Sequence, residues 1–188
     1  MLADQLKTDT LINHQQLEKM LVGRMKAIRS KNDYIQLLQL FYSYFGGLEE
    51  QINSHINENL LPDYVHRRKS AALADDITVL GGVTMPKATE TDLPEISNAQ
   101  QAFAALYVIE GSTLGGKIIS QMMARQLEII DGKGLSFFNS YGDDTELMWG
   151  RFKEALNQQA NTKAEEDDVI DTANQTFIKF KNWVEQHG

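Results

Sequence analysis

The sequence predicts an all-α fold, and three observations support this prediction. In several long segments apolar residues recur every three or four positions, which is the spacing of one face of a helix. The strict apolar–polar alternation of strands is almost absent. All three prolines lie between residues 62 and 94, so the long stretches on either side lack this helix breaker. With 188 residues, no internal repeat and no linker, we expect one domain over residues 1–188.

The first helix is expected over residues 3 to 23. Five residues of this segment project within an arc of about 80° on a helical wheel. They are Leu6, Thr10, His14, Leu17 and Leu21. Because apolar residues dominate this arc, we expect it to face the core, and His14 is therefore expected on the inward face of the helix rather than toward solvent.

The second helix is expected to begin near Asp33, with Ser30 or Asn32 as its N-cap, and to end near Leu61-Pro62. Short polar side chains at these positions can accept hydrogen bonds from the free N–H groups of the first turn. The core-facing stripe of this helix comprises Ile35, Leu38, Phe41, Tyr42, Phe45, Leu48, Ile52 and Ile56.

The third helix is expected over Tyr64 to Leu80 and stops at Gly81-Gly82, because glycine readily adopts the left-handed conformation that closes a helix. The basic run from His66 to Lys69 is expected to be exposed. The rest of the chain is read as a loop at 83–95, a long helix at 97–130, a loop at 131–134, and helices near 143–160 and 165–186.

Composition excludes several classes of function. A formal net charge of −8 argues against nonspecific nucleic-acid binding, which needs a basic surface. The absence of cysteine removes disulfides, thiolate nucleophiles and iron–sulfur ligands. No apolar run approaches the roughly 20 residues that span a bilayer, and the N-terminus lacks an apolar signal core. We therefore expect a cytoplasmic protein without a nucleic-acid or membrane partner.

Three glycines interrupt the long helix at 97–130: Gly111, Gly115 and Gly116, within Gly-Ser-Thr-Leu-Gly-Gly. Each costs about 1 kcal/mol relative to alanine in a helix interior. Without Cβ atoms the backbone can bend and approach a flat ligand closely. The alternative is tight packing between helices through small residues, and the glycines alone leave it open.

His14 is the candidate metal ligand of this chain. Neutral imidazole is a common axial ligand of heme iron. The sequence has no cysteine and no HExxH pair, and its other histidines are His55, His66 and His187. The alternative for His14 is a core histidine whose ring is satisfied by neighbouring groups.

These segments together resemble the heme oxygenase family. The stretch LKTDTLINHQQLE, Leu6 to Glu18, is similar to the proximal helix of that family, and the stretch from Asn32 to Ile52 is similar to its second helix. ALYVIEGSTLGGKII, Ala105 to Ile119, resembles the glycine-rich distal helix of the bacterial branch, which includes phytochrome-associated enzymes. The blocks Leu135–Gly142 and Ala173–Trp183 also match, so the resemblance covers nearly the whole chain.

The resemblance implies a helical fold that holds heme between the N-terminal proximal helix and the glycine-kinked distal helix. It implies cleavage of heme by dioxygen and reductant to biliverdin, carbon monoxide and iron. Heme would be both substrate and cofactor, with electrons from an external reductase or ferredoxin. His14 would ligate the iron, and Gly111, Ser112 and Gly115 would be catalytic. The expected heme contacts are Lys7, His14, Leu17, Glu18, Tyr107, Gly111, Ser112, Gly115, Gly116, Arg151 and Phe177.

One position departs from the mammalian-type pattern. Those enzymes carry an aspartate directly after the first distal glycine, where it helps to order water, and this chain has Ser112. The hydroxyls of Ser112 and Thr113, backbone groups and ordered water would then supply the proton.

The anionic propionates of heme need basic partners. Lys7 is the candidate that the resemblance supports, and Arg151 and Lys153 are further candidates. Lys117 and Arg125 would instead form a docking face for the electron-donor protein.

Three other interpretations stay open at this point. A heme carrier or sensor without turnover would fit Ser112 but would not need the glycine kink. A structural relative that acts on another small molecule, as in the thiaminase-like branch, would not need His14 in its LxxxTxxxH context. A helical interaction module would leave the three glycines without a role.

Overall fold

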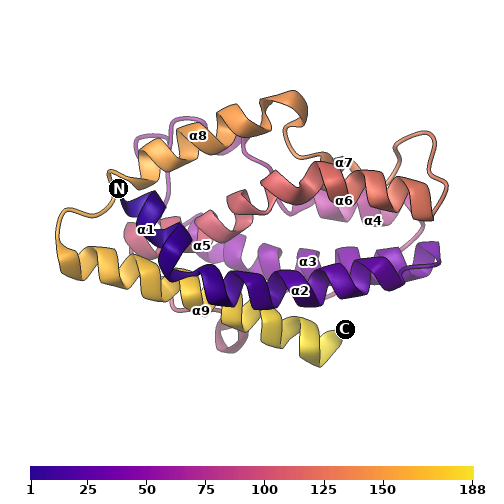
Figure 1. Cartoon of the computed structure of the whole chain (residues 1–188), viewed down its shortest axis with the longest axis horizontal. Helices are drawn as coiled ribbons and strands as arrows, with labels where there is room; N and C mark the ends of the chain where they lie inside the picture. Colours follow the sequence, from indigo (N-terminus) through magenta and orange to yellow (C-terminus); the bar gives the residue numbers. More distant parts are fainter.

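A computed structural model describes residues 1–188 and confirms the all-α prediction (Figure 1). It contains nine α-helices, three single-turn 3-10 helices and no strand. The α-helices are α1 (Leu2–Asp9), α2 (Leu11–Ala27), α3 (Lys31–Ile52), α4 (Ala71–Val79), α5 (Ala99–Gly111), α6 (Thr113–Gln126), α7 (Ser136–Asn139), α8 (Thr145–Leu156) and α9 (Lys163–His187). The 3-10 helices are Tyr64–His66, Glu90–Asp92 and Gly142–Asp144.

The predicted first helix is in fact two helices, because the chain breaks at Thr10. The Thr10 hydroxyl donates to the Leu6 carbonyl at 2.7 Å, and a threonine that bonds back to the preceding turn bends a helix. Leu17 and Leu21 are buried as predicted, but His14 is exposed, contrary to the expectation of an inward face. His14 shares one face of α2 with Leu17 and Leu21, but α2 makes few close contacts with α5 or α6, so the ring stays exposed beside Phe177 of α9.

The N-terminus of α3 has the predicted cap. The Ser30 hydroxyl accepts from the Asp33 N–H at 3.1 Å, and the Asp33 carboxylate accepts from the Ser30 N–H at 2.9 Å, so the two residues form a capping box. The helix ends at Ile52, earlier than predicted, and Asn57 then accepts from the N–H of Asn59 in a tight turn. The predicted stripe is buried except for Tyr42, which is half-buried.

The predicted third helix is also interrupted, and the expectation that its basic run is exposed is wrong. A 3-10 turn ends at His66, and α4 begins only at Ala71. Arg67 and Arg68, between the two, are buried with 3% and 9% of their surface exposed. Their partners lie on other helices, so tertiary contacts override helix propensity here. The predicted glycine stop is confirmed, with Gly81 at φ 86°.

The long helix predicted at 97–130 is broken at Ser112 into α5 and α6, as the glycines indicated. The two helices together, Ala99–Gln126, are long and apolar enough to cross a membrane by length and composition, which the sequence expectation had denied. In an 18-residue window of this stretch the mean hydropathy is 1.2, and 56% of the window is buried within the protein. A core helix of a globular protein satisfies the same criterion.

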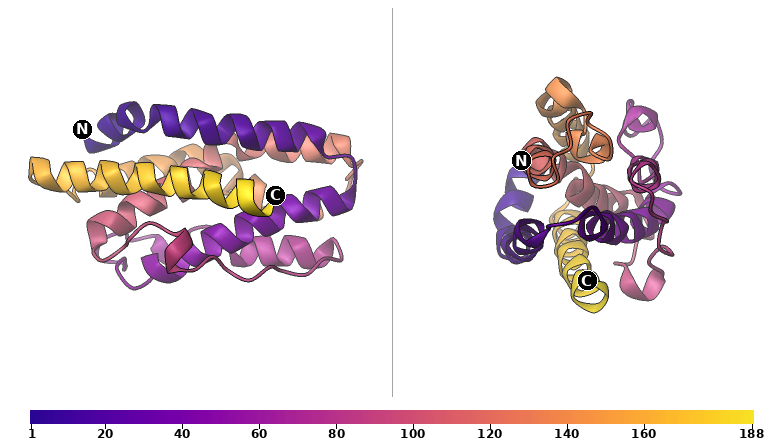
Figure 2. Two further views of the ribbon diagram at one scale, coloured as in Figure 1. Left: turned by 90° about the horizontal axis from the view of Figure 1, so that it is seen from below. Right: turned by 90° about the vertical axis from the view of Figure 1, so that its right-hand side faces the viewer.

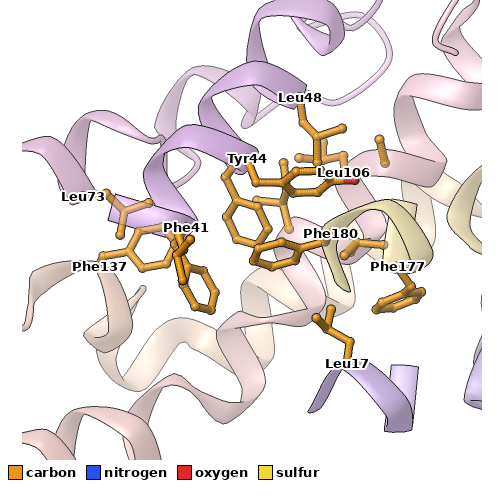
Figure 3. Packing of buried hydrophobic residues seen from close by; sticks show 14 of the residues in the cluster. Leu17, Phe41, Tyr44, Leu48, Leu73, Leu106, Phe137, Phe177 and Phe180 are labelled. Atoms are coloured by element: carbon orange, nitrogen blue, oxygen red, sulfur yellow. The ribbon is translucent and has the colours of Figure 1, made fainter. Parts of the chain in front are cut away.

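The helices pack around α5 and α9. α9 contacts α5 most extensively and also supports α2, while α6 packs on α7 (Figures 1 and 2). Aromatic residues of α3, α7 and α9 fill the centre, where the Tyr44 and Phe180 rings stack 4.5 Å apart (Figure 3). One connected cluster of buried apolar residues draws on all nine helices. This core holds α2 and the α5–α6 pair at fixed positions.

Candidate functional site

Two attachments, one at each end, join α2 to the α5–α6 pair. At one end Thr10, where α1 meets α2, lies beside the Tyr107 side chain of α5, and burial raises the pKa of Tyr107 while Thr10 lowers it in part. At the other end the Gln126 amide donates to the carbonyls of Met25 at 3.0 Å and Ile28 at 2.9 Å. Between these attachments α2 makes few close backbone contacts with α5 or α6. His14 and the glycine segment both lie in this interval.

His14 lies on α2, one turn after Thr10. Its exposed ring stacks on Phe177 of α9, with centroids 5.3 Å apart and planes 25° apart. The preceding residue, Asn13, donates to the Asn174 side chain of α9 at 2.6 Å, which fixes this part of α2. An exposed imidazole held by a stacked ring is suited to bind a metal through a ring nitrogen.

The segment Gly111–Gly116 is called the distal kink below, and its three glycines have different surroundings. A methyl group added at Gly115 would meet no atom within 4 Å, and one added at Gly111 would meet only the edge of the Trp149 ring at 3.9 Å. A methyl group at Gly116 would collide with the Phe138 carbonyl of α7. Packing therefore explains Gly116, whereas nothing in the protein requires glycine at Gly111 or Gly115.

Trp149 of α8 closes one side of the distal kink. Its ring lies 5.5 Å from that of Tyr107 and 5.6 Å from that of Phe152, measured between centroids. Sequence reasoning did not single out Trp149, because its position at the kink depends on how α8 packs on α5. The wall that it forms with Tyr107 is apolar and aromatic, which is typical of sites for flat ligands.

The hydroxyls of the distal kink are engaged within the protein. Ser112 Oγ donates to the Ile109 carbonyl at 2.6 Å and accepts from Arg68 Nη2 at 2.6 Å. Thr113 Oγ1 donates to the Glu110 carbonyl at 2.6 Å. A hydroxyl has one proton to donate. The Ser112 and Thr113 hydroxyl protons, which were predicted to serve a water network, are therefore both donated to backbone carbonyls.

Behind the kink lies a buried charged cluster that the sequence prediction missed. Arg67 Nη1 and Glu110 Oε2 are 2.6 Å apart, with both side chains fully buried, and the Tyr141 hydroxyl donates to Glu110 at 2.9 Å. Burial lowers the pKa of Arg67, but Glu110 and Asp63 raise it by more. The sequence signal for this cluster was Glu110, which follows an apolar run and was therefore a candidate for burial. A buried carboxylate requires a buried cation as its partner.

Arg68 contacts the distal kink directly. Nη1 donates to the Phe137 carbonyl and to Ser140 Oγ, both at 3.1 Å, and Nη2 donates to the Ile109 carbonyl at 2.9 Å as well as to Ser112. The guanidinium lies 3.8 Å from the centre of the Phe137 ring. Burial lowers the pKa of Arg68 to about 10, so the side chain stays charged at neutral pH. All four Nη hydrogens are thus used, two toward Ile109 and Ser112 at the bend and two toward Phe137 and Ser140.

The remaining predicted heme contacts lie on α1, α2 and α8. Lys7 on α1, Glu18 on α2 and Arg151 on α8 are exposed. Leu17 is buried and lies beside Phe177 and the core aromatic residues (Figure 3).

The other basic candidates lie on α8 and α6. Lys153 is half-buried, with its ammonium 5.9 Å from the Trp149 ring. Lys117 and Arg125 are exposed on α6, and the exposed apolar side chain of Ile118 lies beside Lys117 in the sequence.

Comparisons with known proteins agree on one family. The family model described as heme oxygenase matches residues 1–186. A heme oxygenase of Xanthomonas campestris is 31% identical over 147 residues, which covers 78% of this chain and 86% of the relative. Heme oxygenase 1 of a Nostoc species is 21% identical over 206 residues, covering 100% of this chain and 86% of the relative.

Solved structures share the fold. The heme oxygenase of Neisseria meningitidis, whose crystal structures were determined with NO and CO bound, superposes with a TM-score of 0.85 at 23% identity and covers 100% of this chain and 92% of its own. The heme oxygenase of Leptospira interrogans superposes with a TM-score of 0.78 at 22% identity and covers 98% of both chains.

Proposed function

The chain belongs to the heme oxygenase family, and on that basis we propose that it binds heme between α2 and the α5–α6 pair, with His14 as the iron ligand. It is an enzyme that degrades heme to biliverdin and uses electrons from a reductase. Membership of this family favours turnover over the carrier or sensor interpretation.

The observation that carries the proposed heme position is the contrast between the glycines of the distal kink. Gly116 is explained by the Phe138 carbonyl behind it, while a Cβ at Gly115 would meet no atom within 4 Å and one at Gly111 only the edge of the Trp149 ring at 3.9 Å. Ser112 at the break keeps right-handed helical angles, φ −64° and ψ −18°, so Gly111 and Gly115 still lie about one turn apart and present one strip of bare backbone. A flat ligand that approaches this strip closely accounts for the absence of Cβ atoms there.

Each side chain then has a definite task. Heme supplies the redox chemistry when it is bound, and the protein orients it and controls access to it. His14, whose ring is stacked on Phe177, would bind the iron, and Gly111 and Gly115 would let the backbone approach the bound heme. Tyr107 and Trp149 line an edge.

Further residues act around the heme rather than on its faces. Lys7 and Arg151 pair with the propionates, because a cation beside a carboxylate forms the stronger, charge-assisted kind of hydrogen bond. Leu17 and Glu18 flank the proximal side, one buried and one exposed. Ser112 and Gly116 act from behind the kink, because their contacts lie with Arg68 and α7.

The electron donor docks on α6 in this proposal. Lys117 and Arg125 are exposed on that helix and would pair with acidic groups of a reductase or ferredoxin. We place the enzyme in the cytoplasm, without a membrane or nucleic-acid partner, on the basis of its family and its net charge of −8.

The decisive experiment replaces His14 with alanine. We expect His14→Ala to lose the absorption spectrum of the six-coordinate, low-spin heme complex at alkaline pH, because the substitution removes the proposed iron ligand. Added imidazole should restore the spectrum. His66→Ala is the matched control, since His66 is exposed in a 3-10 turn at a different place in the fold. An unchanged spectrum in His14→Ala would overturn the assignment and direct attention to His55.

A further inference from the structure

We propose that Arg68 is a positioning residue for heme cleavage, whose guanidinium fixes the angle of the distal kink and so determines which edge of the heme is attacked. The inference rests on the proposed heme position between α2 and the distal kink. Arg68 does not touch the heme in that proposal. It acts only through the backbone of the distal kink, which covers the heme.

Arg68 joins the kink to α7. On one side it binds the Ile109 carbonyl and Ser112 Oγ, which flank the bend between α5 and α6. On the other side it binds the Phe137 carbonyl and Ser140 Oγ. Ser140 has φ 53° and ψ −115°, a conformation that non-glycine residues rarely adopt. A single buried side chain therefore holds together two backbone segments that both depart from regular structure.

The front of the kink cannot set its own position. Gly115 has no protein atom within 4 Å of a Cβ position, and Gly111 has only the ring edge of Trp149. The contacts that locate this backbone come from behind, through Arg68 and through Gly116 against the Phe138 carbonyl. A small rotation at Ser112 would shift the strip of bare backbone across the proposed heme position, because only the ring edge of Trp149 lies in front of it.

The two neighbouring arginines have separate partners. Arg67 forms a buried ion pair with Glu110 and a partly buried one with Asp63, and these compensate its charge. Arg68 has no carboxylate among its hydrogen-bond partners, which are two carbonyls and two hydroxyls. A buried charge without a counter-ion in contact is costly. A neutral side chain would suffice for packing, so the charge of Arg68 indicates a role in holding the kink carbonyl and hydroxyl strongly.

The test compares Arg68→Met and Arg68→Lys with Arg67→Lys as the matched control. The heme complexes are turned over with ascorbate in the presence of catalase, and the biliverdin isomers are separated by chromatography. We expect Arg68→Met to lose about tenfold in isomer preference, equivalent to about 1.4 kcal/mol between the competing attack positions. Arg68→Lys should recover part of the preference, and Arg67→Lys should keep the wild-type isomer pattern even if its stability falls.

Two further measurements keep the test independent of folding and of turnover. Ser112→Ala removes one Arg68 contact without burying a new group, and it should change the isomer ratio in the same direction by a smaller factor. Amide hydrogen exchange of heme-free protein should become faster over residues 109–120 in the Arg68 variants and stay unchanged there in Arg67→Lys.

A wild-type isomer pattern in Arg68→Met, or in Ser112→Ala if Arg68→Met does not fold, would overturn the proposal, as would an equal change in Arg67→Lys. The heme spectrum of each variant reports on His14 separately. A failed isomer prediction with an intact spectrum therefore leaves the proposed heme site standing, whereas loss of ligation in His14→Ala is decided without reference to Arg68.

Discussion

At the scale of single residues, Gly115 and Gly116 are adjacent but serve different purposes. The first faces open space and the second faces the Phe138 carbonyl at a distance that excludes a Cβ. Gly116 leaves room for a neighbouring segment, and Gly115 exposes bare backbone. Mutation can therefore separate the two roles, although the sequence shows only a Gly-Gly pair.

Alanine at each of the two positions should have opposite effects on stability. Gly115→Ala should raise the unfolding free energy of the heme-free protein by up to about 1 kcal/mol, through helix propensity, and should weaken heme binding. Gly116→Ala should lower the unfolding free energy by about 1–3 kcal/mol through overpacking. Urea unfolding and heme titration measure the two quantities. Unaltered heme affinity in Gly115→Ala would remove the reason for placing heme against that face.

At the scale of single elements, helix ends were the features that local sequence specified best. The capping box of Ser30 and Asp33 starts α3, and Gly81 in the left-handed region stops the α4 segment. Both signals depend on side chains within a few residues of the helix end. Helix continuity was specified less well, because the breaks at Thr10 and at Arg67 depend on contacts with other parts of the molecule or on a hydroxyl that bonds backward.

The Asp33 cap predicts a dependence of stability on pH. Hydrogen bonds from the Arg29 N–H and from Ser30 lower the pKa of Asp33 below its usual value of 3.8. The ionised carboxylate therefore stabilises the folded state above that value, and this contribution is lost as the pH falls through the lowered pKa. Asp33→Asn should lower the urea midpoint at pH 7, and the difference from wild type should shrink toward pH 3.

Asp75→Asn is the control for this pH series, since Asp75 is exposed on α4 and away from the helix N-terminus. Its urea midpoint should follow that of the wild type at each pH. A difference between Asp33→Asn and wild type that stays constant down to pH 3 would show that the carboxylate charge does not contribute to the cap.

At the scale of the whole molecule, the site depends on two helices held apart yet joined at their ends. α2 is supported by α9 along its length, while α6 is supported by α7. The Gln126 amide, which bonds the carbonyls of Met25 and Ile28, is the attachment at the far end from Thr10 and Tyr107. Between these two attachments, the distance between α2 and α6 is set by α9, which supports α2, and by α7, which supports α6.

Removing this attachment should loosen the site without touching it. Gln126→Met keeps the side-chain length but deletes both donated hydrogen bonds, and should reduce the unfolding free energy by about 1–2 kcal/mol. Heme should dissociate several-fold faster, measured by transfer to an apo-globin. Gln121→Met, an exposed change on the same helix, should leave the rate unchanged. Equal heme loss from wild type and Gln126→Met would show that the attachment does not control the separation.

The sequence by itself determined the helical class, the order of the long helices, the cap at Ser30, the stop at Gly81 and the break within the 97–130 segment. These features depend on periodicity and on the backbone preferences of single residues, which are local properties. The family resemblance carried by the His14 and Gly111–Gly116 motifs was likewise readable, and the family comparisons confirm it.

Only the tertiary structure decided which glycine is packed and which is open, and that the Arg67-Arg68 pair is buried behind the kink. It also decided that the Ser112 hydroxyl faces a guanidinium. In each case the partners lie far apart in the chain: Phe138 for Gly116, Glu110 for Arg67, and Arg68 for Ser112. The basic run His66–Lys69 is predicted to be exposed from sequence alone, because the free energy of burying a charge depends on the groups that surround it in space.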